Sequence, residues 1–164
     1  MYSNTGNEYI EKAVYNYSKS MLNAAYSILK SSDDAEDAVQ EAFLKYIQKQ
    51  PTFNSREHEK AWLIRVTINI SKNMLRSSER KNLPVGEDIL NNQIEKSNEN
   101  TNEILECVLC LEEKYRIIIH LYYYEEYSLK EIASILHLPL ATVGTRLSRG
   151  RKILKTMLKG DFDL

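Results

Sequence analysis

In YSLKEIASILHLPLATVGTRLSRGRKILK, residues 127–155, two short helices are predicted around a tight turn. Ser128 is placed to cap the first helix, because Glu131 follows at the three-residue spacing of a capping box. Pro139 ends that helix, since it has no N–H to donate and biases Leu138 away from helical angles. A second helix restarts directly after the turn. The stretch therefore predicts a helix-turn-helix.

The second helix, from about Leu140 to beyond Leu154, has one apolar and one basic side. No acidic residue occurs between positions 140 and 159. The apolar side holds Val143, Leu147, Ile153 and Leu154. The other side holds hydroxyls and cations at Thr142, Thr145, Arg146, Ser148, Arg149, Arg151, Lys152 and Lys155. An αα-hairpin with a solvated basic face is the plainer alternative. The capped first helix, short turn and acid-free second helix together favour DNA binding.

Composition is that of a globular protein with one domain or two small ones. The chain has 164 residues, 43% of them hydrophobic, and its mean hydropathy is −0.46. No run approaches the roughly 18–20 apolar residues that cross a bilayer. The first residues, MYSNTGNEYIEK, lack the basic and apolar regions of a signal peptide. We therefore expect a cytoplasmic protein.

The net charge of −1 conceals an uneven distribution. Residues 33–41 are acidic without a base, residues 60–81 are basic apart from Glu79, and residues 87–103 are acidic again. This alternation suits one surface for a basic protein partner and two surfaces for DNA. Cys107 and Cys110 form a C-x-x-C, which a redox pair or half a zinc site would explain. No second pair exists and no His lies at ligand spacing, so free thiols on an amphipathic helix are favoured, and no cofactor is predicted.

Apolar residues recur at helical spacing throughout, so the predicted fold class is all-α. Helices are expected near residues 10–28, 33–47, 57–80 and 104–122, before the helix-turn-helix. Expected inner faces are Ile10, Val14, Tyr17, Met21, Ala24 or Ala25, and Ile28; then Val39, Ala42, Phe43, Tyr46 and Ile47; then Ala61, Trp62, Val66, Ile70 and Met74. Residues 81–101 are rich in Asn and acids and read as a flexible acidic linker. Two small helical domains, residues 1–80 and 102–160, are therefore predicted.

Three segments in this order resemble the extracytoplasmic-function (ECF) sigma factors of bacterial RNA polymerase. DDAEDAVQEAFLKYI (33–47) is similar to the family's polymerase-binding segment. EKAWLIRVTINISKNMLR (59–76) is similar to its −10-recognition and strand-opening helix, and residues 128–154 to its −35-binding helix-turn-helix. The resemblance covers nearly the whole chain. It implies a sigma factor that binds RNA polymerase core through the β′ and β subunits, recognises promoter DNA and starts transcription. It also allows for an anti-sigma partner.

The resemblance assigns roles to residues of the first predicted domain. It implies that core polymerase is bound by Asp34, Asp37, Val39, Gln40, Glu41 and Leu44. It implies that the −10 DNA is bound by two groups of residues. They are Phe53, Asn54 and Ser55 in a loop, and Arg65, Asn69, Lys72, Asn73 and Arg76 on the following helix. Amides that read base edges and cations along a strand are what opening a duplex requires. Without the resemblance, the acidic helix is equally well explained as a solvated face. Trp62 fits a core anchor better than a base-stacking role.

In the second domain, the resemblance implies that the −35 DNA is bound by the eight hydroxyl and cationic residues named above. Arg149 is the best candidate for bidentate readout of guanine, whereas Arg146, Arg151 and Lys155 fit phosphate contacts. The chain departs from the family at Gly144, where a side chain often reaches DNA. A stand-alone helix-turn-helix regulator is the alternative function, although it would need neither the acidic helix nor the Asn-bearing helix. An enzyme is a distant third, because no phosphate loop, metal-spaced cluster or nucleophile constellation occurs.

Overall fold

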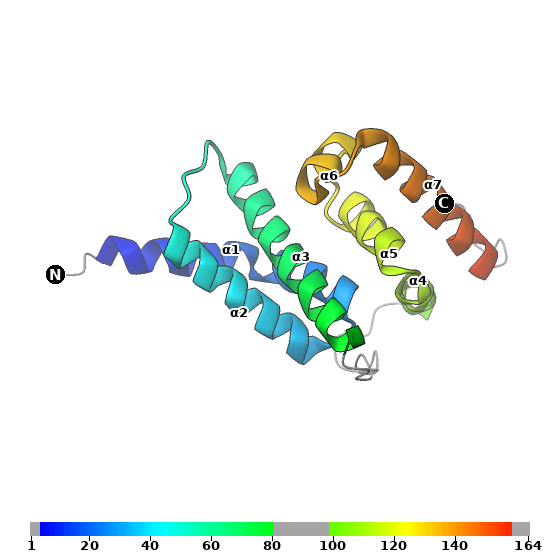
Figure 1. The fold of residues 1–164 in the computed structure, drawn as a ribbon, viewed down its shortest axis with the longest axis horizontal. Coiled ribbons are helices and arrows are strands. Elements are labelled where there is room, and N and C mark those ends of the chain that lie inside the picture. The colour runs from blue at the N-terminus through cyan, green and yellow to red at the C-terminus, as the bar shows by residue number, and fades with distance from the viewer. Residues whose placement is uncertain (1–3, 81–98, 159–164) are drawn as a thin grey trace. The chain divides into compact units, whose positions relative to one another are not determined.

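The computed structural model describes residues 4–80 and 99–158, with side chains over 8–79 and 103–158. The chain forms two compact units, Met1–Val85 and Gly86–Leu164. All regular structure in the described residues is helical, as the sequence predicted (Figure 1). No described helix has the length and apolar character needed to cross a membrane.

The first unit packs three helices: α1 (Asn4–Leu29), α2 (Ser32–Lys49) and α3 (Arg56–Arg80) (Figure 1). Small residues make the centre of this contact. Ala24 and Ala25 of α1 and Ala38 and Ala42 of α2 are all fully buried. Side chains of this size let helix axes approach closely and leave room for the larger Met21.

The predicted inner face of α3 is partly wrong. Of its five expected residues only Ile70 is buried, and the buried face centres on Leu63, Ile64, Thr67 and Ile68. Thr67 is inside because its hydroxyl donates to the Leu63 carbonyl at 2.7 Å, and Ser71 donates likewise to the Thr67 carbonyl. A polar side chain satisfied by its own helix can be buried at little cost. Val14 and Ile47, also expected inside, are each about two-fifths exposed at 41% and 42%.

The second unit holds α4 (Glu99–Cys110), α5 (Glu113–Ile119), a π-helical turn η2 (His120–Tyr124), α6 (Leu129–Leu136) and α7 (Leu140–Met157). The predicted linker lies mostly outside the described residues, but α4 already begins at Glu99, so its last three residues are helical. The core joins α5 to α7 through Tyr115, Ile118, Leu147 and Leu154. Arg116, also buried, donates from Nη1 to the carbonyl of Leu111, which directly follows α4.

Candidate polymerase and nucleic-acid interfaces

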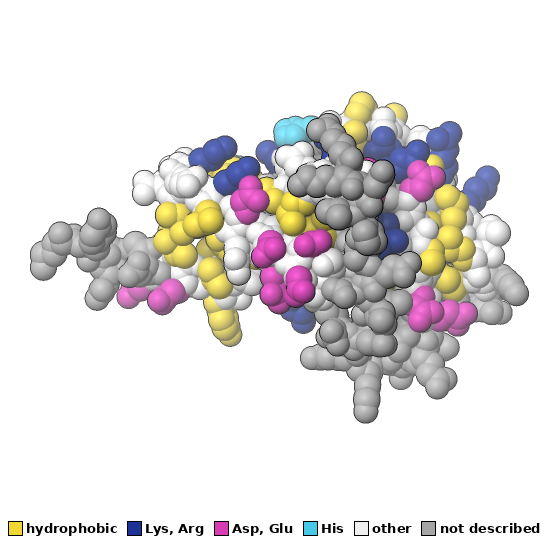
Figure 2. Space-filling view, turned by 60° about the horizontal axis from the view of Figure 1, so that its bottom comes forward, with side chains coloured by type: hydrophobic (Ala, Val, Ile, Leu, Met, Phe, Trp, Pro, Cys, Tyr) yellow, Lys and Arg dark blue, Asp and Glu magenta, His cyan; other side chains and the backbone are white. Residues whose placement is uncertain are grey.

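An acidic and apolar stripe runs along the outside of α2. Ser31 caps the helix by accepting from the Asp34 N–H at 3.2 Å, and Asp33 and Asp34 occupy the first turn, where the helix dipole favours acids. Asp37, Gln40, Glu41 and Leu44 follow at spacings of three and four, and all are exposed. Leu44 is 57% exposed. Acidic side chains gather beside apolar ones on the surface in Figure 2.

Val39 does not belong to this stripe. Its side chain is 6% exposed and packs in the core of the first unit, so the predicted contact with polymerase is corrected. The exposed apolar residue that sequence reasoning missed is Ile47, which lies three positions after Leu44 on the same side of the helix. The three-residue spacing from Leu44 indicates this position, although Ile47 also fits the apolar spacing of the inner face.

The loop between α2 and α3 holds an aromatic cluster. Phe53 packs at ring-centroid distances of 6.2 Å from Tyr46, 5.9 Å from Trp62 and 5.3 Å from His58. The Trp62 ring centroid lies 5.9 Å from those of both Tyr46 and Phe53, but the side chain is only half-buried and so is less enclosed than a core anchor. Tyr46 is fully buried and donates its hydroxyl to Glu59 Oε2 at 2.8 Å. Burial, together with hydrogen bonding to Tyr9 and Glu59, raises the pKa of Tyr46 far above its usual value.

The polar residues of this loop already have local partners. Ser55 Oγ accepts from the His58 N–H at 3.1 Å and so caps the start of α3. His58 Nδ1 accepts from the Asn54 N–H at 3.3 Å, which places the proton of a neutral imidazole on Nε2. The Asn54 side chain is exposed. His58 is thus part of the loop's geometry, although only its neighbours were predicted as site residues.

One face of α3 carries amides and cations. Asn69 and Asn73 are exposed one turn apart, and Arg76 is exposed a further turn along. Arg65 and Lys72 are half-buried on the same side. The structure therefore brings all five of these predicted residues onto a single stripe.

The helix-turn-helix forms where the sequence predicted it. Ser128 Oγ accepts from the Glu131 N–H, and the Ser128 N–H donates to Glu131 Oε1, both at 3.1 Å, which completes the capping box. His137 ends α6 in the left-handed region at φ 53°, and its N–H donates to the Ala133 carbonyl. After Pro139 the chain enters α7. The turn is the predicted His137–Pro139.

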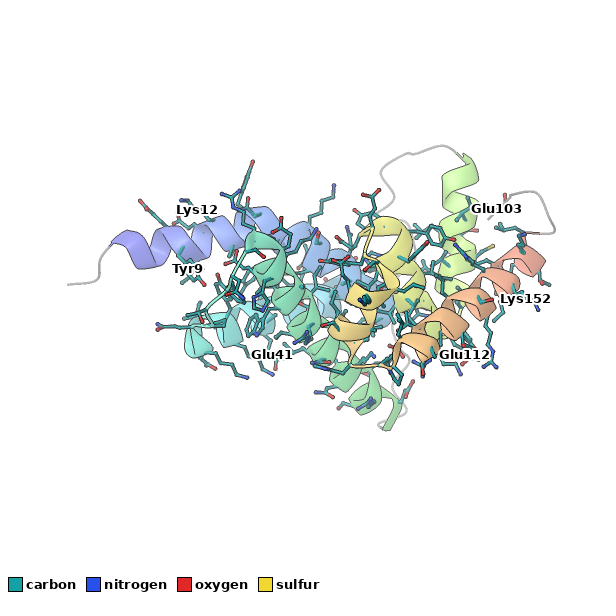
Figure 3. The ribbon with its side chains drawn as sticks, turned by 90° about the horizontal axis from the view of Figure 1, so that it is seen from above. Tyr9, Lys12, Glu41, Glu103, Glu112 and Lys152 are labelled. Carbon is teal, nitrogen blue, oxygen red and sulfur yellow. The ribbon has the colours of Figure 1, made fainter. Side chains whose placement is uncertain are left out.

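The outer face of α7 holds most of the predicted −35 residues. Thr145, Ser148, Arg149, Lys152 and Lys155 are exposed, and Thr142 and Arg146 are half-buried beside them. Figure 3 labels Lys152 on this helix.

Arg151 is the exception. Its Nε donates to the Tyr123 hydroxyl, and its guanidinium carbon lies 5.5 Å from the ring centroids of Tyr122 and Tyr123. Two residues beyond Arg149 is about 200° around the helix, so Arg151 fastens η2 to α7. Arg151 thus has an intramolecular partner in addition to the phosphate contact predicted for it, which stays a prediction.

Two glycines of α7 differ in their surroundings. A Cβ on Gly144 would meet nothing within 4 Å, so packing does not demand glycine there. A Cβ on Gly150 would lie 2.8 Å from Ile119 Cδ1 and 3.4 Å from Tyr115 Cβ. Gly150 therefore lets α7 approach α5 closely, a role that no local pattern signals.

The cysteines of α4 are free, with Cys107 half-buried and Cys110 exposed. Burial raises the pKa of Cys107, which lowers its thiolate fraction. Among the described residues, no group of three or more His, Cys, Asp or Glu side chains is placed to hold a metal ion.

Two family models match this chain, one in each of its two units. Residues 14–81 match the family model for sigma-70 region 2, and residues 101–154 match that for sigma-70 region 4. The ECF RNA polymerase sigma factor SigW of Bacillus subtilis is 30% identical over 159 residues, covering 87% of this chain and 85% of the relative. RNA polymerase sigma factor SigV of the same organism is 31% identical over 137 residues, covering 82% and 81%.

A solved structure shares the fold. The sigma factor RpoE, crystallised with the anti-sigma factor NepR from Bartonella quintana, matches with a TM-score of 0.79 at 23% identity. That match covers 93% of this chain and 98% of the other. With two family models in the expected order and relatives matched over most of their length, the chain belongs to the sigma-70 family of RNA polymerase sigma factors, in its extracytoplasmic-function group.

Proposed function

We propose that this sigma factor divides its work among three surfaces: the α2 stripe binds RNA polymerase core, α3 and its preceding loop engage the −10 DNA, and α7 reads the −35 DNA. The observation that carries the proposal is the separation of exposed charge. The α2 stripe presents exposed acids at Asp37 and Glu41, whereas the Asn-bearing stripe of α3 and the outer face of α7 present amides, hydroxyls and cations. In this proposal residues 1–80 act as region 2 and residues 102–160 as region 4.

The polymerase surface combines charge with apolar contact. Asp34, Asp37, Gln40 and Glu41 supply acceptors, and Leu44 with Ile47 supplies apolar area that water otherwise covers. An acidic rim around exposed apolar residues fits a basic protein partner, because charge speeds and orients encounter while apolar burial supplies affinity. We place the β′ contact here and leave any β contact to the second unit.

The −10 surface has the chemistry needed to hold a separated strand. Asn69 and Asn73 present amides that pair with base edges, and Arg65, Lys72 and Arg76 line the same stripe for phosphates. Phe53 is half-buried against Trp62, so it acts as one wall of a base pocket whose exposed edge is formed by Asn54. Ser55 contributes through its cap of α3.

The −35 surface is the exposed side of α7. Arg149 is the proposed base reader, with Thr142, Thr145, Ser148 and Lys152 around it. Arg146 and Lys155 are proposed as phosphate contacts. A stand-alone regulator would need only this surface, whereas the α2 and α3 surfaces fit the sigma factor.

In this proposal the chain directs transcription initiation and leaves the chemistry of RNA synthesis to the polymerase, so it is not itself an enzyme. It acts in the cytoplasm, where its polymerase partner works. Two similar structures are complexes: RpoE is bound to the anti-sigma factor NepR, and CnrH to the cytosolic domain of CnrY. This supports an anti-sigma protein as a further partner.

Reconstitution with RNA polymerase core tests the proposal. Wild-type holoenzyme should select and transcribe a discrete set of promoters from a genomic DNA library. Asp37→Lys with Glu41→Lys should weaken core binding, and Asn69→Ala with Asn73→Ala should spare core binding but impair opening, seen as permanganate-reactive thymines. Glu8→Lys with Glu11→Lys, on exposed positions of α1, is the charge-matched control. Equal core binding by the α2 variant and the control would contradict the α2 assignment.

A further inference from the structure

A hollow of about 390 Å³ lies between α7 and the beginning of α5, inside the second unit. It is lined by Lys114, Tyr115, Ala141, Thr142, Thr145, Arg146 and Arg149. Five of these residues belong to α7 and two to α5, which precedes the helix-turn-helix in sequence. The hollow therefore adjoins the proposed −35 surface but is completed by a separate helix.

The lining of this hollow suits an anion. Three cationic side chains, Lys114, Arg146 and Arg149, reach it from two helices, and two threonine hydroxyls lie among them. Among the described residues that form the lining none is acidic. The Lys114 ammonium lies 5.0 Å from the Tyr115 ring centroid, so its stem is supported while the side chain stays 45% exposed. Cations and hydroxyls together are the usual donors to DNA phosphates.

We propose that the hollow seats a backbone phosphate of the −35 DNA and that Lys114 supplies a phosphate contact from outside the helix-turn-helix. The inference rests on the proposed −35 role of α7. DNA is the indicated source of the phosphate, because Thr145 and Arg149 line the hollow and also belong to the outer face of α7. In this proposal, a duplex bound along that face brings a backbone phosphate of one strand close to Lys114.

Glu112 holds Lys114 in the free protein and opposes this contact. Its Oε2 lies 3.7 Å from Lys114 Nζ, and its side chain is 74% exposed (Figure 3 labels Glu112). An exposed ion pair at this distance is weak, so a DNA phosphate can replace Glu112 as the partner of Lys114. Glu112 thus lowers the affinity for −35 DNA, and a single substitution of Glu112 should raise that affinity.

The test measures the affinity of reconstituted holoenzyme for a promoter selected from the genomic library, across a range of salt concentrations. Lys114→Ala should weaken binding to all −35 sequences alike and reduce the salt slope by about 0.9, the value for one phosphate contact. Glu112→Gln should tighten binding by about 1.5- to 5-fold, the range that an exposed ion pair accounts for. That gain should largely vanish when Lys114 is already alanine.

Matched controls make the outcomes separable. Lys19→Ala and Glu106→Gln remove the same charges at other exposed positions and should leave affinity unchanged. Arg149→Ala reports on the proposed −35 role itself. If Arg149→Ala loses −35 preference while Lys114→Ala keeps wild-type affinity and salt slope, the phosphate seat is wrong and the proposed function stands. If neither variant changes −35 binding, the proposed role of α7 fails first.

Discussion

Replacing each of the two glycines of α7 by alanine should have opposite consequences, although both lie inside the same helix. At Gly144 the new methyl meets nothing within 4 Å. The substitution therefore retains the full gain in helix propensity, about 0.8–1 kcal/mol. For a unit of this size, that gain corresponds to a rise in melting temperature of roughly 4–8 °C.

At Gly150 the same propensity gain is opposed by a clash. The methyl would lie 2.8 Å from Ile119 Cδ1 and 3.4 Å from Tyr115 Cβ. Ile119 is only 4% exposed, so its end cannot swing into solvent, and a Cβ is fixed by its backbone. Overpacking of this kind typically costs about 1–3 kcal/mol. We expect Gly150→Ala to be less stable than Gly144→Ala by about that amount, and neutral or destabilised relative to wild type.

Urea or thermal unfolding of the full chain measures both variants, with far-UV circular dichroism reporting all helices. Trp62, the single tryptophan, lies in the first unit, so its fluorescence transition should stay unchanged and serves as an internal control. Equal stabilisation by the two substitutions would refute the reasoning, because it would mean that α7 does not approach α5 closely at Gly150.

Three further predictions concern acid stability, the α2 stripe and the aromatic cluster. Burial lowers the pKa of His120 from 6.5 to about 4, so this group favours the folded state fully above pH 6.5. Up to about 3 kcal/mol of unfolding free energy is lost as the pH falls from 6.5 towards 4, because the unfolded chain binds the proton more readily. His120→Phe should therefore flatten the pH dependence of urea unfolding in that window. Val39→Ala should cost at least about 1.5 kcal/mol of unfolding free energy, whereas Leu44→Ala should leave stability nearly unchanged and weaken core binding in a titration with labelled core. Tyr46→Phe should cost about 1.5–3 kcal/mol, because it removes a hydrogen bond to the Glu59 carboxylate; an unshifted Trp62 unfolding transition would contradict this.

The features that the sequence predicted well are those set by near neighbours in the chain. The capping box of α6 and the turn at His137–Pro139 depend on residues within a few positions of each other. The order of helices and the stripes of exposed polar residues follow from spacing alone. Local signals of this kind are complete in the sequence itself.

The features that it missed depend on distant partners. Thr67 is polar and is absent from the apolar face expected for its helix, but its hydrogen bond to the Leu63 carbonyl allows burial. In the sequence Arg151 cannot be distinguished from its basic neighbours, because its hydrogen-bond partner Tyr123 lies 28 residues earlier in the chain. The close approach at Gly150 likewise arises only where α7 packs against Ile119 and Tyr115 of α5. Such contacts leave no periodic trace in one sequence.

The contact between α5 and α7 links the stability of the second unit to its chemistry. Gly150 permits a separation at which Ile119 and Tyr115 pack against α7, and Tyr115 supports the neighbouring Lys114 at the edge of the hollow. The distance between the cation of α5 and those of α7 is therefore fixed by a glycine that does not face the hollow itself. A side chain at position 150 that forced the helices apart would move Lys114 relative to Arg146 and Arg149 without touching any of them. Loss of −35 affinity in Gly150→Ala is the expected consequence, with the exposed-site variant Lys19→Ala unaffected. The packing side of the recognition helix is then as much a determinant of DNA binding as its exposed side.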